Sequence, residues 1–190
     1  MRKKVNKSKF ALIFASIIVV FSLGFPLAGL SGNKQGKVAM NEKVNLPFKI
    51  KDNEKIILLY FGYVGCSTIC EPSLKEISSV YDNLLDAQKE RVSVYFIDIA
   101  KDTNMAKEFA SHFNDSFVGL DLDAIATAKL MADLRAYSSD SLTGNGEISH
   151  TGYLYLIKQT QKQVFELNAI YITRPFDPAS IGQDITKELK

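Results

Sequence analysis

The stretch Tyr60–Pro72, YFGYVGCSTICEP, holds both cysteines of the 190-residue chain, Cys66 and Cys70. It overlaps an apolar run, KIILLYF at Lys55–Phe61, which is typical of a buried central strand. A helical pattern comes next, and Pro72 suits its first turn, where the missing N–H group is not needed. The two cysteines are therefore predicted to lie where a central strand ends and a helix begins.

Apolar runs and helical patterns alternate along the rest of the chain. This alternation indicates an α/β fold with one central mixed sheet flanked by helices, in the element order of the thioredoxin fold. In that fold the cysteines occupy the active-site position, at the edge where open α/β sheets place their ligands. The predicted strands are Val92–Ile99, Phe117–Leu120, Gly152–Ile157 and Val164–Leu167. One predicted helix starts at Glu71, and three more cover Thr103–Phe113, Asp123–Tyr137 and Pro178–Lys190. A polar loop is predicted over Ser138–Ser149.

The first 31 residues are predicted to direct export. Arg2 and four lysines precede Phe10–Leu30, which has 21 residues and no charge. As a helix this segment would span about 30 Å, the thickness of the hydrocarbon core of a bilayer. It is either an uncleaved single-pass transmembrane anchor or a cleaved signal peptide, and its basic residues stay on the cytoplasmic side. We expect residues 32–48 to form a linker and N-terminal extension. Residues 49–190 would then be a domain on the extracytoplasmic (periplasmic) side of the cell membrane, or a secreted soluble domain after cleavage.

The spacing of the cysteines permits two chemistries. Cys66 and Cys70 are four residues apart, so both sulfurs face the same side of a helical turn. A helix start favours thiolates, because its unpaired N–H groups and its dipole stabilise negative charge. Oxidised, the pair can form a disulfide; reduced, it offers two soft ligands that select Cu(I) or zinc over hard ions. A metal site on this pair needs a further ligand from elsewhere in the chain.

Two histidines are available as that ligand. His112 falls within a predicted helix and is interpreted as a partly exposed helix residue. His150 ends the polar loop directly before the strand that should lie beside the first central strand, so we expect it to approach the cysteines. No proline lies between Pro72 and Pro175, so His150 stands where thioredoxin-type oxidoreductases carry a cis-proline. Two thiolates and a neutral imidazole suit copper in either oxidation state, Cu(I) or Cu(II), whereas structural zinc normally takes four ligands.

Four stretches resemble the SCO/SenC family, the membrane-tethered copper chaperones of cytochrome c oxidase assembly. They are YFGYVGCSTIC (Tyr60–Cys70), FIDIAKDT (Phe96–Thr103), FVGL (Phe117–Leu120) and SHTGYLYLI (Ser149–Ile157). The resemblance implies a thioredoxin-like fold with an added hairpin. It also implies one copper ion per monomer, bound by Cys66, Cys70 and His150 and delivered to the copper site of a respiratory oxidase. A role in reducing the thiols of that site is implied as well.

The same resemblance suggests three acidic residues around the site. Asp98 and Asp102 match acidic positions of the family after the second strand, and Glu71 follows the second cysteine. They are interpreted either as groups that support the metal ligands or as ordinary loop and helix-start carboxylates. Ile69 and Ser149 stand where the family commonly has acids, so we interpret the chain as a divergent member whose client is not necessarily the usual oxidase.

Three functions stay open at this point. The first is a metal-binding assembly factor, rather than a turnover enzyme, that acts as a monomer on a copper-receiving oxidase subunit or another copper protein. The second is a metal-independent thiol–disulfide reductase that uses Cys66 and Cys70. The third is a redox or copper sensor. Beyond the basic N-terminus the chain is mildly acidic, although its net charge is +2, so a nucleic-acid partner is not expected.

Overall fold

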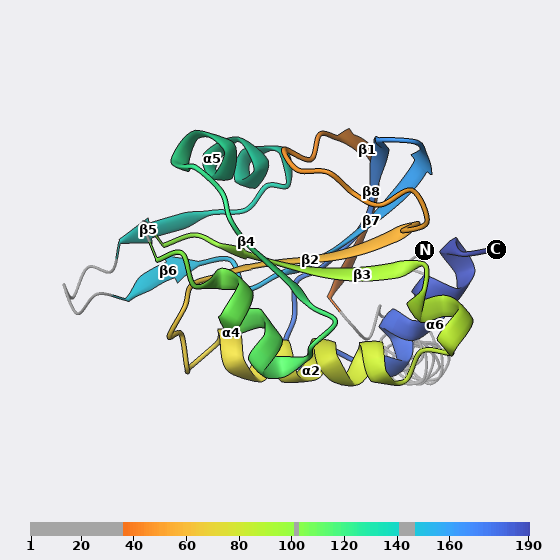
Figure 1. Ribbon diagram of the computed structural model, residues 1–190, viewed down its shortest axis with the longest axis horizontal. Coiled ribbons are helices and arrows are strands. Elements are labelled where there is room, and N and C mark those ends of the chain that lie inside the picture. The colour runs from red at the N-terminus through yellow and green to blue at the C-terminus, as the bar shows by residue number, and fades with distance from the viewer. Residues whose placement is uncertain (1–35, 101–102, 141–146) are drawn as a thin grey trace, which may run out of the picture. The chain divides into compact units, whose positions relative to one another are not determined.

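Strand β2 (Ile56–Gly62) forms the centre of the computed structural model and is buried along its whole length (Figure 1). It pairs in parallel with β3 (Val92–Asp98) on one side and antiparallel with β7 (Leu154–Gln161) on the other. A strand covered on both faces needs apolar side chains in both directions, which explains its unbroken apolar run. The structure describes residues 36–100, 103–140 and 147–190.

The main sheet has six strands, in the order β1-β8-β7-β2-β3-β4. The strands not yet introduced are β1 (Lys37–Val44), β4 (Val118–Asp121) and β8 (Val164–Tyr171). Strands β2, β3 and β4 are parallel, whereas β7, β8 and β1 join by antiparallel pairing. The predicted α/β fold with a central mixed sheet and thioredoxin-like element order is therefore confirmed.

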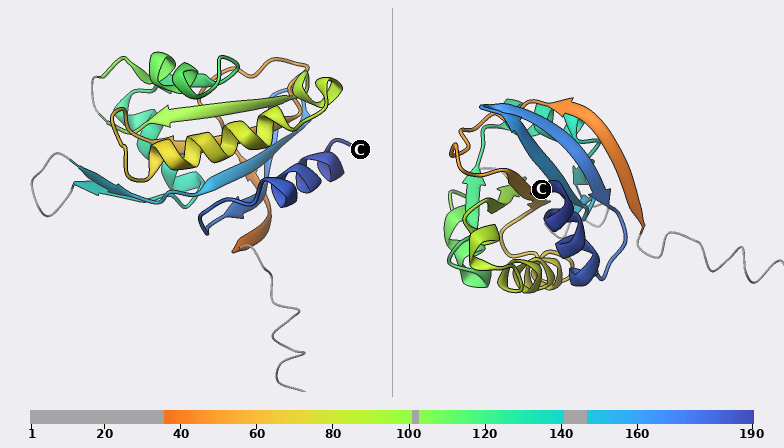
Figure 2. Two further views of the ribbon diagram at one scale, coloured as in Figure 1. Left: turned by 90° about the horizontal axis from the view of Figure 1, so that it is seen from below. Right: turned by 90° about the vertical axis from the view of Figure 1, so that its right-hand side faces the viewer.

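Helices cover both faces of this sheet (Figures 1 and 2). One face is covered by α2 (Cys70–Asp82), α4 (Ala106–Phe113) and α6 (Pro178–Glu188), whose apolar residues pack with both cysteines in one buried cluster. The other face is covered by α5 (Ala124–Asp133) and the segment after β1, in a second cluster. A short helix, α3 (Asp86–Lys89), follows α2. The sheet thus divides the core in two, and the cysteines belong to the α2 side.

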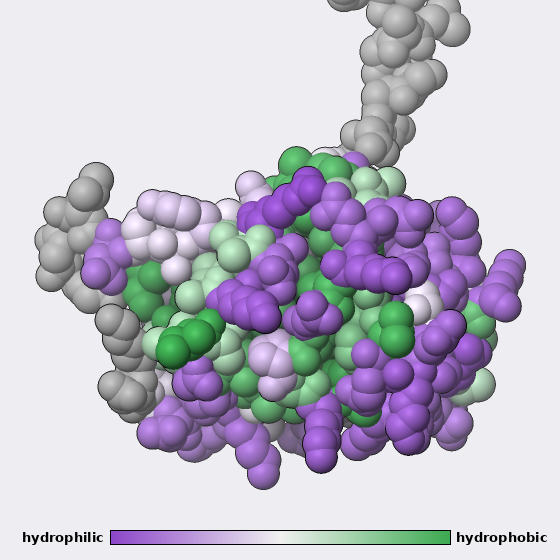
Figure 3. Space-filling view, turned by 90° about the horizontal axis from the view of Figure 1, so that it is seen from above, coloured by the Kyte–Doolittle hydropathy of each residue, from purple (hydrophilic) through white to green (hydrophobic). Residues whose placement is uncertain are grey.

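The outer side of the α5 layer is mostly polar (Figure 3). Apolar areas lie between the polar side chains, and Ile125 at the start of α5 keeps 83% of its surface exposed. Asp123 caps this helix by accepting a hydrogen bond from Ala126 N at 2.8 Å. The predicted helix over Asp123–Tyr137 is too long, because Arg135 adopts a positive φ of 58° and ends the helical conformation.

Two polar segments form strands that the sequence analysis does not predict. Residues 37–44, which lie within the predicted linker and N-terminal extension, form β1 and pair with β8 at the edge of the main sheet. The polar loop over Ser138–Ser149 contains β5 (Ser138–Asp140) and β6 (Ile148–His150), which pair as a separate two-stranded sheet. Backbone hydrogen bonds hold both segments, so their side chains need little apolar character.

The smaller differences concern element ends. Helix α4 begins at Ala106 rather than Thr103, and β8 extends beyond Leu167 to Tyr171. The predicted anchor or signal segment, residues 1–31, lies outside the described residues. Within the described ranges, every helix is too short or too polar to cross a lipid bilayer.

Candidate metal centre

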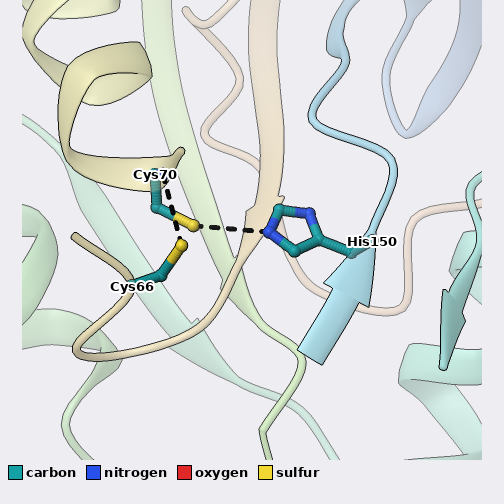
Figure 4. Close-up of side chains that lie close together, drawn as sticks. All are labelled: Cys66, Cys70 and His150. Atoms are coloured by element: carbon teal, nitrogen blue, oxygen red, sulfur yellow. Dashed lines mark hydrogen bonds between the residues drawn. The ribbon is translucent and has the colours of Figure 1, made fainter. Parts of the chain in front are cut away.

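Three side chains meet at the carboxyl end of β2. The sulfurs of Cys66 and Cys70 and a ring nitrogen of His150 all lie within 4.8 Å of one another (Figure 4). Cys70 Sγ lies 3.5 Å from His150 Nε2. Both cysteines are free thiols and both are buried, with exposed fractions of 2% for Cys66 and 0% for Cys70. The structure therefore brings together the three residues that the sequence analysis selects.

Cys66 also organises the start of α2. The residue before this helix, Ile69, offers no side-chain cap. Instead the backbone N–H of Cys70 donates to Cys66 Sγ at 3.3 Å, and the N–H of Glu71 donates to the Cys66 carbonyl at 3.2 Å. The turn before it passes through Gly65, whose φ of 88° suits glycine. Cys66 thus satisfies N–H groups that an ordinary helix leaves to a polar cap.

The two thiols have opposite acidities. The side chain of Cys70, the imidazole of His150 and the N–H groups of the helix start lower the pKa of Cys66 well below that of an ordinary thiol. The neighbouring Cys66 side chain and burial raise the pKa of Cys70. The negative charge on Cys66 therefore disfavours a second negative charge on Cys70 in the same buried site. Without a cation, the favoured state is a Cys66 thiolate beside a Cys70 thiol.

The hairpin fixes the position and tautomer of His150. Ring nitrogen Nδ1 lies 3.2 Å from the carbonyl oxygen of Thr151, which can only accept, so Nδ1 carries the hydrogen. Nε2 then presents its lone pair toward Cys70, as a metal ligand would. At the hairpin base the N–H of Thr151 donates to the Tyr137 carbonyl at 2.9 Å, and the N–H of Tyr137 donates to Thr151 Oγ1 at 3.2 Å.

A cavity of about 210 Å³ opens onto Cys66 and His150. The ring of Tyr63 packs edge-on against that of His150, with centroids 5.9 Å apart, and burial raises the pKa of its phenol to about 12. Glu147 on the hairpin lines the same cavity and supplies a carboxylate near the site. Sequence reasoning missed Tyr63 and Glu147, although both lie within three residues of a selected ligand. The lining residues are Tyr63, Cys66, Thr68, Ile69, Glu147, Ile148, Ser149 and His150.

The three suggested acidic residues lie outside this cluster or outside the described residues. Asp98 is buried and accepts hydrogen bonds from Thr103 Oγ1 and, at 2.9 Å, from Ala100 N. Burial raises the pKa of this carboxyl group despite these bonds. Glu71 in the first turn of α2 lies 3.9 Å from the ammonium of Lys75. Asp102 lies outside the described residues. Asp98 therefore holds the loop between β3 and α4, and Glu71 contributes a charge at the helix start.

The donor set fits a soft metal ion. Two sulfurs and an imidazole nitrogen favour Cu(I), Cu(II) or zinc over magnesium or calcium. The metal-free pair can instead take part in thiol–disulfide exchange, because Cys66 is deprotonated and a thiolate is the nucleophile of that reaction. His112, the other histidine, is exposed on α4 and plays no part in the cluster.

Comparison with known proteins identifies relatives of the chain. A family model described as SCO1/SenC matches residues 50–188. A SCO2-like protein of Rickettsia prowazekii is 26% identical over 183 residues, covering 83% of this chain and 87% of that protein.

Solved structures share the fold. Apo Sco1 from Thermus thermophilus superimposes with a TM-score of 0.61 at 21% identity, covering 80% of this chain and 91% of that one. ScoI of Bradyrhizobium japonicum, solved with copper bound, gives a TM-score of 0.59 at 22% identity, covering 80% of this chain and 98% of that one.

Proposed function

The chain belongs to the SCO1/SenC family, and from this premise we propose that it binds one copper ion per monomer through Cys66, Cys70 and His150. The observation that supports the proposal most directly is the convergence of these three donor atoms within 4.8 Å. They come from the turn before α2, from the first residue of that helix and from a hairpin residue 80 positions after Cys70. Copper in this site is cargo to be passed on, as the family membership suggests.

Charge balance favours copper at this position. Copper would replace the Cys70 proton and let both sulfurs carry their negative charge, which the metal-free pair resists. With Cu(I) the two thiolates and a neutral imidazole leave one negative charge, and with Cu(II) they leave none. A three-ligand site also keeps a coordination position for an incoming ligand, whereas structural zinc is normally closed by four.

Metal analysis of the full chain tests this function. Chain purified reduced and without oxygen is expected to hold about one Cu(I), and His150→Ala and Cys66→Ser are expected to lose it because each removes a donor. His112→Ala is the matched control, since it removes an exposed imidazole that is not part of the cluster. Retention of copper by His150→Ala would rule out the three-ligand site.

Delivery and membrane attachment complete the proposal. The protein is anchored by residues 10–30 on the outer side of the cell membrane and passes copper to a respiratory oxidase subunit or another copper protein. The basic N-terminus followed by 21 uncharged residues supports this location. Fractionation of cells tests it: the chain should stay with membranes after alkaline extraction, and a chain lacking residues 1–30 should not. A wild-type chain released by that extraction would favour cleavage and secretion.

The unequal thiols favour a second function, thiol–disulfide reduction. The Cys66 thiolate would attack a disulfide of the client, releasing one client thiolate and forming a mixed disulfide. Cys70 would then lose its proton, attack Cys66 and release the second client thiol. Burial of both cysteines opposes access by a large client. If this is the main role, His150→Ala leaves exchange with a client disulfide intact and copper makes no difference.

A further inference from the structure

Two hydroxyl groups near Cys70, those of Tyr60 and Ser73, are deeply buried. Tyr60 is fully buried and Ser73 is 1% exposed. Among the described residues, neither hydroxyl oxygen meets a partner in hydrogen-bond geometry. An unsatisfied buried hydroxyl costs on the order of 1–3 kcal/mol, so its retention calls for an explanation.

Both residues lie beside Cys70. Ser73 follows Cys70 by three residues on α2, so the two side chains lie on the same side of the helix. A Cβ built on Gly62 would lie 2.8 Å from Cys70 Sγ and 3.3 Å from Tyr60 Cε1. The sulfur and the hydroxyl-bearing edge of the Tyr60 ring therefore flank the same glycine. The groups also affect one another's acidity: the Cys66 side chain and burial raise the pKa of Cys70, whereas the Tyr60 hydroxyl lowers it. Burial and the neighbouring Cys70 raise the pKa of Tyr60, whereas the Ser73 hydroxyl lowers it.

We propose that the Tyr60 and Ser73 hydroxyl groups are a preformed pair of donors that stabilises Cys70 as a thiolate once copper is bound. A neutral thiol is a weak acceptor, so the pair has little to bond while Cys70 keeps its proton. Copper displaces that proton to solvent and leaves a charged sulfur, and hydrogen bonds to charged groups are about twice as strong as neutral ones. Tyr60 then donates to the sulfur, and Ser73 donates to the Tyr60 oxygen.

This inference rests on the proposed function and assigns Tyr60 a positioning role. It also explains why a tyrosine, Tyr60, stands in a strand whose other residues are apolar. Phenylalanine would fill the same space without an unsatisfied group, so the hydroxyl serves the state in which Cys70 is charged.

The chain supplies a matched control in Tyr155. Tyr155 is also fully buried, and its hydroxyl also meets no partner in hydrogen-bond geometry among the described residues. It lies opposite Leu59 on the neighbouring strand, whereas Tyr60 lies opposite Leu154. Tyr155 belongs to the α5-side cluster and Tyr60 to the cluster with the cysteines. Replacing either tyrosine by phenylalanine removes the same buried group, but only Tyr60 packs in the cluster that contains the cysteines, whereas the Tyr155 hydroxyl interacts with Thr151.

The experiment compares wild type, Tyr60→Phe, Ser73→Ala and Tyr155→Phe as full-length chains in detergent. Cu(I) affinity is measured by competition with a chromophoric chelator, and Cu(II) loading by the absorption band of thiolate-to-copper charge transfer. Tyr60→Phe should bind Cu(I) about tenfold more weakly, from the loss of one charge-assisted hydrogen bond. Its band should move to longer wavelength, because the sulfur loses a donor. Ser73→Ala should change both readouts in the same direction but less.

The control separates this effect from packing. Tyr155→Phe should stay within about twofold of wild type in affinity, since Tyr155 packs on the α5 side of the sheet, away from both cysteines, and the Thr151 hydroxyl keeps its bond to the Tyr137 N–H. Both phenylalanine variants should unfold at or above the wild-type temperature, because each loses an unsatisfied group. Equal affinity and an unmoved band in Tyr60→Phe, or equal changes in Tyr155→Phe, would overturn the inference alone. A wild-type chain that takes up no copper would overturn the proposed function as well.

Discussion

Cys70 Sγ lies 3.5 Å from His150 Nε2, although 80 residues separate them in the chain. The first residue begins α2 and the second ends a hairpin outside the main sheet. The site therefore depends on three local structures: the Cys66 turn, the glycine under Cys70, and the base of the hairpin. Each of these can be changed without removing a ligand.

Gly62→Ala should destabilise the protein. Its Cβ would lie 2.8 Å from Cys70 Sγ and 2.9 Å from Phe96 Cε2, so buried side chains must shift. Overpacking of this kind typically costs about 1–3 kcal/mol, and it should also weaken copper binding by moving Cys70. Gly182→Ala on α6 is the control, because its Cβ meets nothing within 4 Å and should raise helix stability by about 0.5–1 kcal/mol. Urea unfolding measures both; equal stability of the two variants would contradict the packing argument.

The metal-free cysteines should differ in reactivity with pH. Because the pKa of Cys66 is lowered, iodoacetamide should modify it well below the ordinary thiol pKa of about 8.5. Cys70, whose pKa is raised, should stay unmodified over the same range. Peptide mass analysis identifies the labelled residue, and preferential labelling of Cys70 would refute the assignment.

The same shift has a consequence for stability. Unfolding returns Cys66 to its ordinary pKa, so its thiolate stabilises the fold fully above about pH 8.5, and this contribution falls as pH drops toward the folded pKa. Cys66→Ser should remove that rise of stability with pH. Urea unfolding of reduced protein across this range tests it.

Thr151→Val should loosen the hairpin base. It removes the hydroxyl that accepts the Tyr137 N–H at 3.2 Å, while His150 itself is unchanged. We expect stability to fall by about 1 kcal/mol and Cu(I) affinity to fall about five- to tenfold, less than in His150→Ala. Thr160→Val removes a hydroxyl–carbonyl bond at another hairpin and should leave copper affinity unchanged. Parallel losses in both variants would show that the hairpin base has no special role.

Asp98→Asn should affect the fold more than the metal. The carboxylate accepts bonds from Ala100 N and Thr103, so the amide should cost about 1–3 kcal/mol by weakening that pairing. The pKa of Asp98 is raised, so its contribution to stability is full below the ordinary carboxyl pKa of about 3.9 and declines as pH rises through the folded pKa. The variant should lose that decline while keeping wild-type Cu(I) affinity. A large loss of affinity would instead place Asp98 in the metal site.

The sequence predicts the elements that carry a strong pattern. The apolar run before Gly62 identifies the central strand, and the position of His150 before a second apolar run places it near the cysteines. Strands β1, β5 and β6 are missed because they are polar and are held by backbone pairing. Their side chains therefore show no alternation of apolar and polar residues.

The surroundings of the site are less predictable than its ligands. Tyr60 looks like one more buried residue of a strand, and its approach to Cys70 follows only from the packing of α2 over Gly62. Glu147 reaches the cavity because β6 pairs with β5. The polar sequence of this segment does not predict that pairing. The acids suggested by family resemblance, Asp98 and Glu71, bond elsewhere.

The small sheet of β5 and β6 shares no strand with the six-stranded sheet. A displacement of His150 would therefore break no ladder hydrogen bond of the six-stranded sheet. Under the proposed delivery of copper, a donor atom of the receiving protein would take the vacated coordination position while both sulfurs still bind the ion. Copper exchanged by such an associative route would travel from one protein to the next without ever becoming a free aqueous ion.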